Sequence, residues 1–509
     1  MRGADETQGV PFKLPRYTAV VASVVALVAL VARGTPAAAA SAPLLPVFVA
    51  QPSTYHGDLS RDGMTQSSTI TPGNAGTLGL AWKFAAGNVI SDEPAVVKGI
   101  AYWGDWNGYE HATSSTGVNL WSTFLGTTTN SQCIPSTAGV ASSATVAALN
   151  GVETVWTGDG DGSVSALNAS SGAVLWKTAV APSSGGFIWS SPALYAGSIF
   201  IGVASFGDCP LIPGEVVKLD ASTGSVQAVL DTAPAGCIGN GVWSSPAVDT
   251  TLGAVYVTTG NANCTTSLQN AILKVNASTL ALEDSWQIPP AQWVFDSDWG
   301  SSPTFFTASI GGVVHQMVGS AAKNGTFYAL DRNNIAAGPL WTLAIADGGD
   351  CPQCGNGSIS PAAFDGTTLY VAGGSVTINS VACKGTVDAV APDTGTTLWR
   401  DCLQGGPVLA AITMVPGVLF VADGSQLTAI RATDGVLLFT HTESGGGIFY
   451  GPATAFASQL WIGNTNGSLL SFVLPYQPSG PTWRVGKFAG GSGGPYVTSL
   501  GVLARYRHL

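Results

Sequence analysis

The chain has 509 residues, of which 46% are hydrophobic, only 10% are charged and 65 are glycine. Soluble domains carry about 25% charged residues on average, so this composition favours turns and apolar strands over charged helices. The formal net charge is −11 and lysine and arginine together number 19, which excludes a basic surface for nucleic-acid phosphates. No nucleic-acid partner is therefore expected.

The first segment has the order of parts found in a secretory signal peptide. Lys13 and Arg16 precede an apolar run over residues 18–32, and residues 33–42 are rich in the small side chains that a signal peptidase accepts. The run is short for a membrane-spanning helix. We predict a signal peptide at residues 1–42, and hence a secreted or periplasmic protein with no membrane span after signal cleavage. An uncleaved anchor is the alternative.

A long repeat, residues 78–475, follows an N-terminal extension at residues 43–77. Each copy ends with a large apolar residue after a turn rich in Asp, Asn, Ser and Gly, which favour tight turns. The copies are roughly 40 to 60 residues apart, a length that suits four short strands. The residues that close the copies are Trp82, Trp121, Trp176, Leu230, Trp286, Trp341, Trp399 and Phe439.

Short alternating strands precede these turns, for example at residues 254–257, 368–371 and 418–421. Such strands are typical of sandwiches, barrels and propellers, and a four-stranded unit repeated about eight times selects the propeller. We predict an all-β fold, an eight-bladed β-propeller with four-stranded blades. The last unit lacks a closing phrase, so we expect residues 78–84 to supply its outer strand. Residues 476–509 are a glycine-rich C-terminal tail.

The cysteines number 8, and an even number in an exported protein suggests disulfides. In a propeller, the connections between blades and the loops from the second to the third strand share one face, called here the mouth face. All the cysteines fall on it: Cys133, Cys209, Cys237, Cys264, Cys351, Cys354, Cys383 and Cys402. This predicts a pre-formed opening, although long loops could simply need cross-links. Neighbouring loops favour the pairs Cys351–Cys354, Cys383–Cys402 and Cys237–Cys264.

Three segments resemble those of the PQQ-dependent (quinoprotein) alcohol dehydrogenases. The segment that runs from Trp243-Ser-Ser-Pro to Thr-Thr-Gly-Asn261 is similar to their cofactor-stacking segment. The resemblance implies that Trp243 stacks on the quinone and that Asn261 binds its calcium. Phe295-Asp-Ser-Asp298 resembles the segment of the catalytic base, which implies that role for Asp298. Lys323-Asn-Gly resembles the segment whose cation contacts the quinone oxygens.

The resemblance covers about residues 53–474 and is strongest to the polyvinyl-alcohol-dehydrogenase-like branch without a cytochrome domain. It implies PQQ and Ca²⁺ as cofactors, a small or polymeric alcohol as substrate and a separate electron acceptor. Asp298 would also serve as a metal ligand. Two departures stand out. The adjacent cysteine pair of many relatives is missing, and the acidic calcium ligand has only Asp208, or less well Glu215, as a candidate.

The chemistry of alcohol oxidation suits these residue types. A base must take the hydroxyl proton, which suits Asp298. Oxygen-liganded Ca²⁺, held by Asn261 and carboxylates such as Asp208 and Asp298, would polarise a quinone carbonyl. The Lys323 ammonium would stabilise negative charge, and the Trp243 ring would stack on a planar cofactor. The predicted topology places Trp243, Asn261, Asp298 and Lys323 on the mouth face.

Ordinary structural roles explain the same residues without a cofactor. Trp189, Trp243 and Trp299 recur at the start of a first strand beside Ser-Pro, so Trp243 could be a packing residue of the repeat. Asn261, Asp298 and Lys323 could be turn residues. Two functions therefore remain: a secreted quinoprotein-like oxidoreductase, and a non-catalytic propeller that binds a protein or another ligand. Convergence of Asp208 with the resembling residues at the axis would favour the first.

Overall fold

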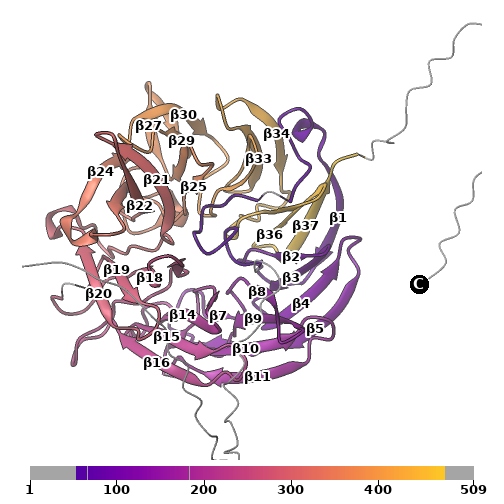
Figure 1. Ribbon diagram of the computed structural model, residues 1–509. Helices are drawn as coiled ribbons and strands as arrows, with labels where there is room; N and C mark the ends of the chain where they lie inside the picture. The colour runs from indigo at the N-terminus through magenta and orange to yellow at the C-terminus, as the bar shows by residue number, and fades with distance from the viewer. Residues whose placement is uncertain (1–52, 66, 183, 267, 476–509) are drawn as a thin grey trace, which may run out of the picture. The chain divides into compact units, whose positions relative to one another are not determined.

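The structure is a computed structural model that describes residues 53–65, 67–182, 184–266 and 268–475. The predicted signal peptide, residues 1–42, and the C-terminal tail, residues 476–509, lie outside the described residues. Within the described part of the chain, no helix is long and apolar enough to cross a membrane. The strands form eight antiparallel blades in a ring (Figure 1), which confirms the predicted propeller.

The first four blades, each from the innermost to the outermost strand, are β2 (Ala95–Val97), β3 (Ile100–Gly104), β4 (Tyr109–Ser114), β5 (Asn119–Phe124); β8 (Thr145–Leu149), β9 (Val152–Gly158), β10 (Ser163–Asn168), β11 (Val174–Ala179); β13 (Ala193–Tyr195), β14 (Ser198–Ser205), β15 (Glu215–Asp220), β16 (Val226–Asp231); and β17 (Ala247–Asp249), β18 (Ala254–Thr258), β19 (Ala271–Asn276), β20 (Leu282–Gln287).

The last four blades are β21 (Thr304–Ile310), β22 (Val313–Ala321), β23 (Thr326–Asp331), β24 (Pro339–Ala344); β25 (Ala363–Phe364), β26 (Leu369–Gly373), β29 (Gly385–Val390), β30 (Thr397–Leu403); β31 (Thr413–Val415), β32 (Val418–Asp423), β33 (Gln426–Arg431), β34 (Leu437–Thr442); and β35 (Thr454–Phe456), β36 (Gln459–Gly463), β37 (Ser468–Val473), β1 (Gly79–Ala85). The loops add short strands and 3₁₀ turns: β6 (Thr128–Thr129), β7 (Thr137–Ala138), β12 (Gly186–Phe187), β27 (Val376–Ile378), β28 (Val381–Cys383), η1 (Ala75–Thr77), η2 (Pro290–Gln292), η3 (Ile335–Ala337) and η4 (Pro352–Cys354).

The ring is closed by the N-terminal strand β1, which completes the last blade beside β37 (Figure 1). The register pairs Leu80 with Phe472 and Phe84 with Leu469. This confirms the prediction that residues 78–84 supply the missing outer strand. The first and last parts of the repeat therefore share one sheet, which joins the two ends of the ring.

Most of the tryptophans that close the repeat donate a hydrogen bond to the turn of the following blade. All eight predicted closing residues lie in outermost strands. The Trp121 indole N–H donates to the carbonyl of Ala169, 2.9 Å away in the turn of the following blade. A Cβ on Gly172 of that turn would lie 2.7 Å from the Trp121 ring, and the φ of Gly172 is +70°. The turn phrase therefore ends in glycine for two reasons, its backbone conformation and its contact with the ring.

Hydroxyl side chains join the inner ends of the blades. Between the first five blades, a backbone N–H donates to the serine hydroxyl of the next blade: Glu93 to Ser143 (2.7 Å), Ser143 to Ser191 (3.0 Å), Ser191 to Ser245 (2.9 Å) and Ser245 to Ser302 (2.8 Å). Around the rest of the ring, a hydroxyl donates to the carbonyl of the next blade: Thr304 to Ala362, Ser360 to Ala410, Thr413 to Ala453 and Thr454 to Pro94. The blades are thus linked in sequence around the whole ring.

The N-terminal extension supplies a segment, residues 53–65 and 67–69, that crosses the middle of the ring and is called here the axial segment (Figure 1, indigo). It has a hydrogen bond to every blade. In blade order, the partners of its residues are His56 with Glu93, Ser53 with Val146, Thr54 with Pro192, Leu59 with Val248, Ser60 with Phe305, Asp62 with Phe364, Gly63 with Met414 and Ser67 with Ala457. The propeller therefore has a central plug made from its own N-terminal extension.

Four disulfides cross-link the loops of the mouth face: Cys133–Cys209, Cys237–Cys264, Cys351–Cys354 and Cys383–Cys402. Three of them are the pairs that neighbouring loops favoured. One placement needs correction, because Cys402 lies inside β30 and not in the connection that follows it. The strand reaches farther than the turn pattern indicated, since it pairs with β29 as far as Leu403.

Candidate functional site

A cavity of about 460 Å³ lies at the mouth face of the ring, on the axis. Trp243, Asn261, Asp298 and Lys323 all line it, and Asp208 joins them from a third blade. These side chains come from the connections that lead into β17 and β21 and from the loops that follow β14, β18 and β22. The convergence that the sequence left open is therefore present in the structure.

Asp298 is held from both of its carboxylate oxygens. Its Oδ2 is 2.5 Å from the Nζ of Lys323, and its Oδ1 accepts the backbone N–H of Asn261 at 2.8 Å. The backbone N–H of Lys323 also donates to the Asp298 carbonyl at 3.2 Å. Because the three residues come from two adjacent blades, these contacts fix the carboxylate across the joint between blades four and five.

Asp296 is a member of this cluster to which the sequence analysis gave no role. Its Oδ1 accepts from the side-chain amide of Asn261 at 2.7 Å, and its Oδ2 is 2.9 Å from the Nζ of Lys323. Its φ of +51° is in the left-handed region, which is unfavourable for residues other than glycine. The only signal in the sequence was the spacing of two carboxylates by one residue, in Asp-Ser-Asp298.

Burial and charge act in opposite directions on this cluster. Burial raises the pKa of Asp298, although the adjacent Lys323 ammonium opposes the rise. Burial alone would lower the pKa of Lys323, but Asp298 and Asp296 together raise it, so the side chain stays cationic. Burial, together with the charges of Asp298 and Asp296, raises the pKa of Asp208 to about 6. At this end of the cavity, three acidic side chains, Asp208, Asp296 and Asp298, therefore interact with one cation, Lys323.

The Trp243 ring forms a flat platform in the cavity because the facing residue has no side chain. A Cβ on Gly300 would lie 1.8 Å from Cη2 of Trp243, inside van der Waals contact. Trp189 and Trp243 each stand three residues before the proline that opens the first strand, and Gly300 takes that place in blade five. Trp299, one residue earlier, is fully buried among Trp286 and Tyr328. Packing thus explains Trp299, whereas Trp243 faces the cavity.

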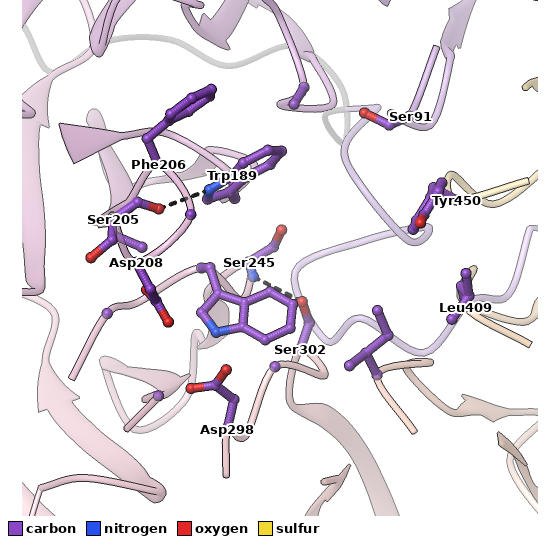
Figure 2. Close-up of a pocket in the computed structure, with 18 of the residues that line it drawn as sticks. Ser91, Trp189, Ser205, Phe206, Asp208, Ser245, Asp298, Ser302, Leu409 and Tyr450 are labelled. Carbon is purple, nitrogen blue, oxygen red and sulfur yellow. Dashed lines mark hydrogen bonds between the residues drawn. The ribbon is translucent and has the colours of Figure 1, made fainter. Parts of the chain in front are cut away.

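Trp189, before β13, and Phe206, after β14, form an aromatic part of the cavity wall. Trp189 donates its indole N–H to the carbonyl of Ser205 at 3.0 Å and stacks on Phe206 with ring centroids 6.4 Å apart (Figure 2). The Cys133–Cys209 disulfide packs in the same apolar cluster. This cross-link therefore holds the wall in place.

Within the described residues, no three histidine, cysteine or carboxylate side chains are grouped as a ready-made metal site. Asp296 and Asp298 instead share the Lys323 ammonium. The oxygen donors near it are those of Asn261, Asp296, Asp298 and Asp208, all of which line the cavity. They are the hard donors that calcium prefers. Because Asp296 and Asp298 already bind the Lys323 ammonium, a calcium ion that used them would require some rearrangement around Lys323.

Comparison with known proteins gives related sequences and folds. The PQQ_2 family model, described as outer membrane protein assembly factor BamB, matches residues 383–454. A polyvinylalcohol dehydrogenase from Pseudomonas sp. is 24% identical over 54% of this chain and 50% of its own length. Quinohemoprotein alcohol dehydrogenase ADH IIB from Pseudomonas putida is 26% identical over 52% of this chain and 43% of its own length. The chain resembles the quinoprotein alcohol dehydrogenases. This confirms the resemblance found in the sequence motifs.

The fold comparison agrees with this resemblance. The crystal structure of quinohemoprotein alcohol dehydrogenase from Comamonas testosteroni matches with a TM-score of 0.66 and 17% identity, over 83% of this chain and 80% of that one. At this identity the match establishes the shared fold. The chain spans about half the length of the curated relatives that it matches.

Proposed function

We propose that the chain is a quinoprotein-type oxidoreductase that oxidises an alcohol with PQQ and a divalent cation, Ca²⁺, bound in the mouth cavity. The observation that carries the proposal is the placement of Asp298. Its carboxylate lies between the Lys323 ammonium and the Asn261 backbone, at the rim of a cavity that also holds the Trp243 platform. Relatives named as alcohol dehydrogenases support the reaction class.

The residues fit a planar, acidic cofactor and a hard cation. Trp243 offers a ring whose other side is pressed on the Gly300 backbone, so it can stack without moving. Asn261, Asp298 and Asp208 would supply oxygen ligands to Ca²⁺. Lys323 would face the quinone oxygens. When bound, the quinone accepts the two electrons and the hydrogen of the alcohol carbon, and the cation polarises its carbonyl.

Asp298 is the group that we assign to proton transfer. Its Oδ atoms would take the hydroxyl proton of the alcohol, which requires the ionised form. The Lys323 ammonium in contact with Oδ2 favours that form and opposes the effect of burial. The same lysine would stabilise negative charge that develops on the quinone oxygens. The Lys323 ammonium would thus both keep the Asp298 carboxylate ionised and stabilise charge on the quinone.

The substrate and partners follow from the relatives and remain part of the proposal. A small or a polymeric alcohol would enter from the mouth, and a separate electron acceptor would take the electrons. Ile134, which lines the cavity, is 96% exposed, and Phe295, next to Asp296 of the lining, is 84% exposed. Exposed apolar side chains there suit a large substrate. Secretion to the periplasm or beyond accords with the four disulfides.

The test is reconstitution of the purified protein with PQQ and CaCl₂, followed by dye reduction with ethanol and with polyvinyl alcohol. Asp298→Asn should lose activity by about a hundredfold or more while PQQ still binds. Asp347→Asn, at an exposed loop aspartate outside the cavity lining, should keep wild-type activity. Absence of both PQQ binding and dye reduction in the wild type would refute the proposal and leave the alternative, a non-catalytic binding propeller.

A further inference from the structure

One disulfide of the mouth face, Cys351–Cys354, closes a much smaller ring than the others. Its cysteines are 3 positions apart in the sequence, whereas those of the other disulfides are 19, 27 and 76 positions apart. The stabilisation that a disulfide gains by restricting the unfolded chain grows with the length of the loop that it closes. Cys354 is exposed, while the other cysteines are buried or half-buried. A reductant should therefore open this disulfide most easily.

The ring belongs to the connection between blades five and six, in a segment at residues 349–358 that is called here the cysteine loop. The carbonyl of Cys351 accepts the backbone N–H of Cys354 at 2.9 Å and that of Asn356 at 3.1 Å. A Cβ on Gly349 would lie 2.4 Å from the side-chain amide nitrogen of Asn356. The start of the loop is therefore packed against the turn that the disulfide closes.

The cysteine loop holds the backbone at Lys323. The N–H of Gly349 donates to the carbonyl of Lys323 at 3.0 Å, and the N–H of Ser358 donates to the carbonyl of Ala322 at 3.2 Å. Between these two contacts, a Cβ on Gly357 would lie 2.1 Å from the Lys323 carbonyl oxygen, and the φ of Gly357 is +63°. Glycine is therefore required for this close approach. The position of the Lys323 backbone thus depends on the loop that contains the disulfide.

The disulfide limits the conformational freedom of this loop. The cysteine loop contains three glycines, and glycine loses more conformational freedom on ordering than any other residue. The hydrogen bonds of Gly349 and Ser358 are modest against the entropy of ordering a segment of this length. An open disulfide would therefore release the loop from the Lys323 backbone. The Lys323 ammonium would then be held less firmly on the Asp298 carboxylate that it contacts.

We propose that the Cys351–Cys354 disulfide is a site of thiol–disulfide exchange with a dithiol, and that its oxidised form positions Lys323. A thiolate of the dithiol would attack the exposed sulfur of Cys354 and break the S–S bond. This step forms a mixed disulfide and leaves Cys351 as a thiolate, which takes up a proton. The second thiol of the dithiol then displaces Cys354 as a thiol, so the dithiol is oxidised to a disulfide and both cysteines are reduced. The role of Lys323 rests on the proposed function, whereas the exchange does not.

The first measurement is the order in which the disulfides open in the purified protein without PQQ. Dithiothreitol is added in steps, free thiols are blocked with N-ethylmaleimide, and the blocked cysteines are identified by peptide mass spectrometry. Cys351 and Cys354 should be blocked at a dithiothreitol concentration about tenfold below that needed for the other pairs. If another disulfide opens first, or if all four open together, the exchange site is refuted.

The second measurement is amide hydrogen exchange, also without PQQ. In the selectively reduced protein, the N–H groups of Gly349 and Ser358 should exchange about five to ten times faster, as expected for the loss of one hydrogen bond each. Re-oxidation should restore the slow exchange. Equal exchange of these amides in the oxidised and reduced protein would show that the disulfide does not hold the loop on Lys323.

A double variant with Cys351→Ser and Cys354→Ser has a permanently open ring and should show the fast exchange without any reductant. The matched control carries Cys383→Ser and Cys402→Ser, which remove a disulfide of blade six outside the cysteine loop. The control should keep the slow exchange at Gly349. Fast exchange in the control as well would indicate a general loosening of the propeller and would overturn a specific role for the Cys351–Cys354 ring.

The third measurement is the pH dependence of dye reduction by the protein reconstituted with PQQ and CaCl₂. Burial raises the pKa of Asp298, and the Lys323 ammonium opposes the rise. A loosened Lys323 should therefore move the acid side of the activity profile to higher pH, by about one pH unit. Re-oxidation of the reduced wild type should reverse this shift, and the Cys383→Ser, Cys402→Ser control should not show it.

The outcomes separate this inference from the proposed function. Early blocking of Cys351 and Cys354, with faster exchange at Gly349, would establish the exchange site and its hold on the Lys323 backbone even if the wild type binds no PQQ. An active enzyme whose acid side is the same in the oxidised and reduced forms would refute the positioning of Lys323 and leave the proposed function intact.

Discussion

Gly300 and Trp243 lie so close that a Cβ on the glycine would be 1.8 Å from Cη2 of the indole ring. The benzene ring of Trp243 is therefore supported by bare backbone from the next blade. This contact crosses the same joint between blades four and five as the contacts of Asp298 with Asn261 and Lys323. The Trp243 ring and the Asp298 carboxylate are thus both positioned by the interface between blades four and five.

Gly300→Ala should displace the Trp243 ring into the cavity. The added methyl cannot be accommodated by backbone on one side and by the ring on the other, so we expect the affinity for PQQ to fall about tenfold or more, with a changed tryptophan fluorescence spectrum. Gly79→Ala is the control, since a Cβ at that position would meet nothing within 4 Å. Unaltered PQQ affinity in Gly300→Ala would show that the ring does not serve as the platform.

Asp296→Ala should loosen both Asn261 and Lys323, since Asp296 bonds to each of them. We expect a higher Ca²⁺ concentration for half-maximal activity, by about tenfold, the equivalent of roughly 1.4 kcal/mol. Asp296→Asn keeps the shape and one acceptor oxygen, and should lie between the alanine variant and the wild type. A Ca²⁺ requirement equal to that of the wild type in both variants would exclude a positioning role for Asp296.

The protein should become less stable as the pH rises, because the buried carboxyl group of Glu110 must then ionise. Glu110 is 0% exposed, and neither carboxylate oxygen receives a hydrogen bond from the described residues. Burial, with the nearby Asp92 and Asp159, raises its pKa well above the ordinary 4.5. The folded protein therefore holds this proton more tightly than the unfolded chain, so the stabilisation is full below pH 4.5 and is lost as the pH rises towards the folded value.

Glu110→Gln removes this titration. Urea denaturation should show that the variant is more stable than the wild type at pH 8, by about 1 kcal/mol or more, and that the advantage shrinks at pH 5. Asp350→Asn, at an exposed site, should change neither value. A variant that is less stable than the wild type at pH 8 would indicate that the ionised carboxylate has a stabilising partner.

Removal of residues 1–69 should destabilise the propeller although no strand of a blade is lost. Those residues include the axial segment, with its hydrogen bonds to all eight blades, each of which contributes about 1 kcal/mol. We expect a loss of roughly 5 kcal/mol or more and a broader thermal transition. A chain that begins at residue 43 should melt like the full chain. Equal melting of both shortened chains would mean that the axial segment adds little.

The sequence predicted the propeller in detail because its signal is periodic. The turn phrases and closing residues such as Trp121 and Trp176 mark the outer strand of every blade, and the missing eighth phrase indicated where β1 belongs. The axial segment left no comparable signal. Its residues contact a different blade every one or two positions in an irregular conformation, and no repeat or alternation describes such contacts.

The candidate site was partly predictable for a related reason. Motif resemblance and the sorting of loops by face pointed to Asn261, Asp298 and Lys323, and the structure brings them into one cavity. The role of Asp296 depends on a left-handed backbone turn that aims its carboxylate back at Asn261, which spacing alone does not predict. Which of Trp243 and Trp299 faces the cavity depends on Gly300. The effect of this glycine on Trp243 arises only when blades four and five are packed together.

The axial segment also has a consequence for how the ring is completed. Stacked repeats normally interact only with their neighbours, so an extra or missing unit is tolerated at little cost. Here the axial segment precedes the repeat in the chain and is synthesised before it, yet its partners are spread over every blade, up to Ala457 in the last one. A ring with the wrong number of blades, or with one blade misfolded, would leave backbone groups of this segment unpaired. All the hydrogen-bond partners of the axial segment are therefore present only when the ring has its full number of correctly folded blades.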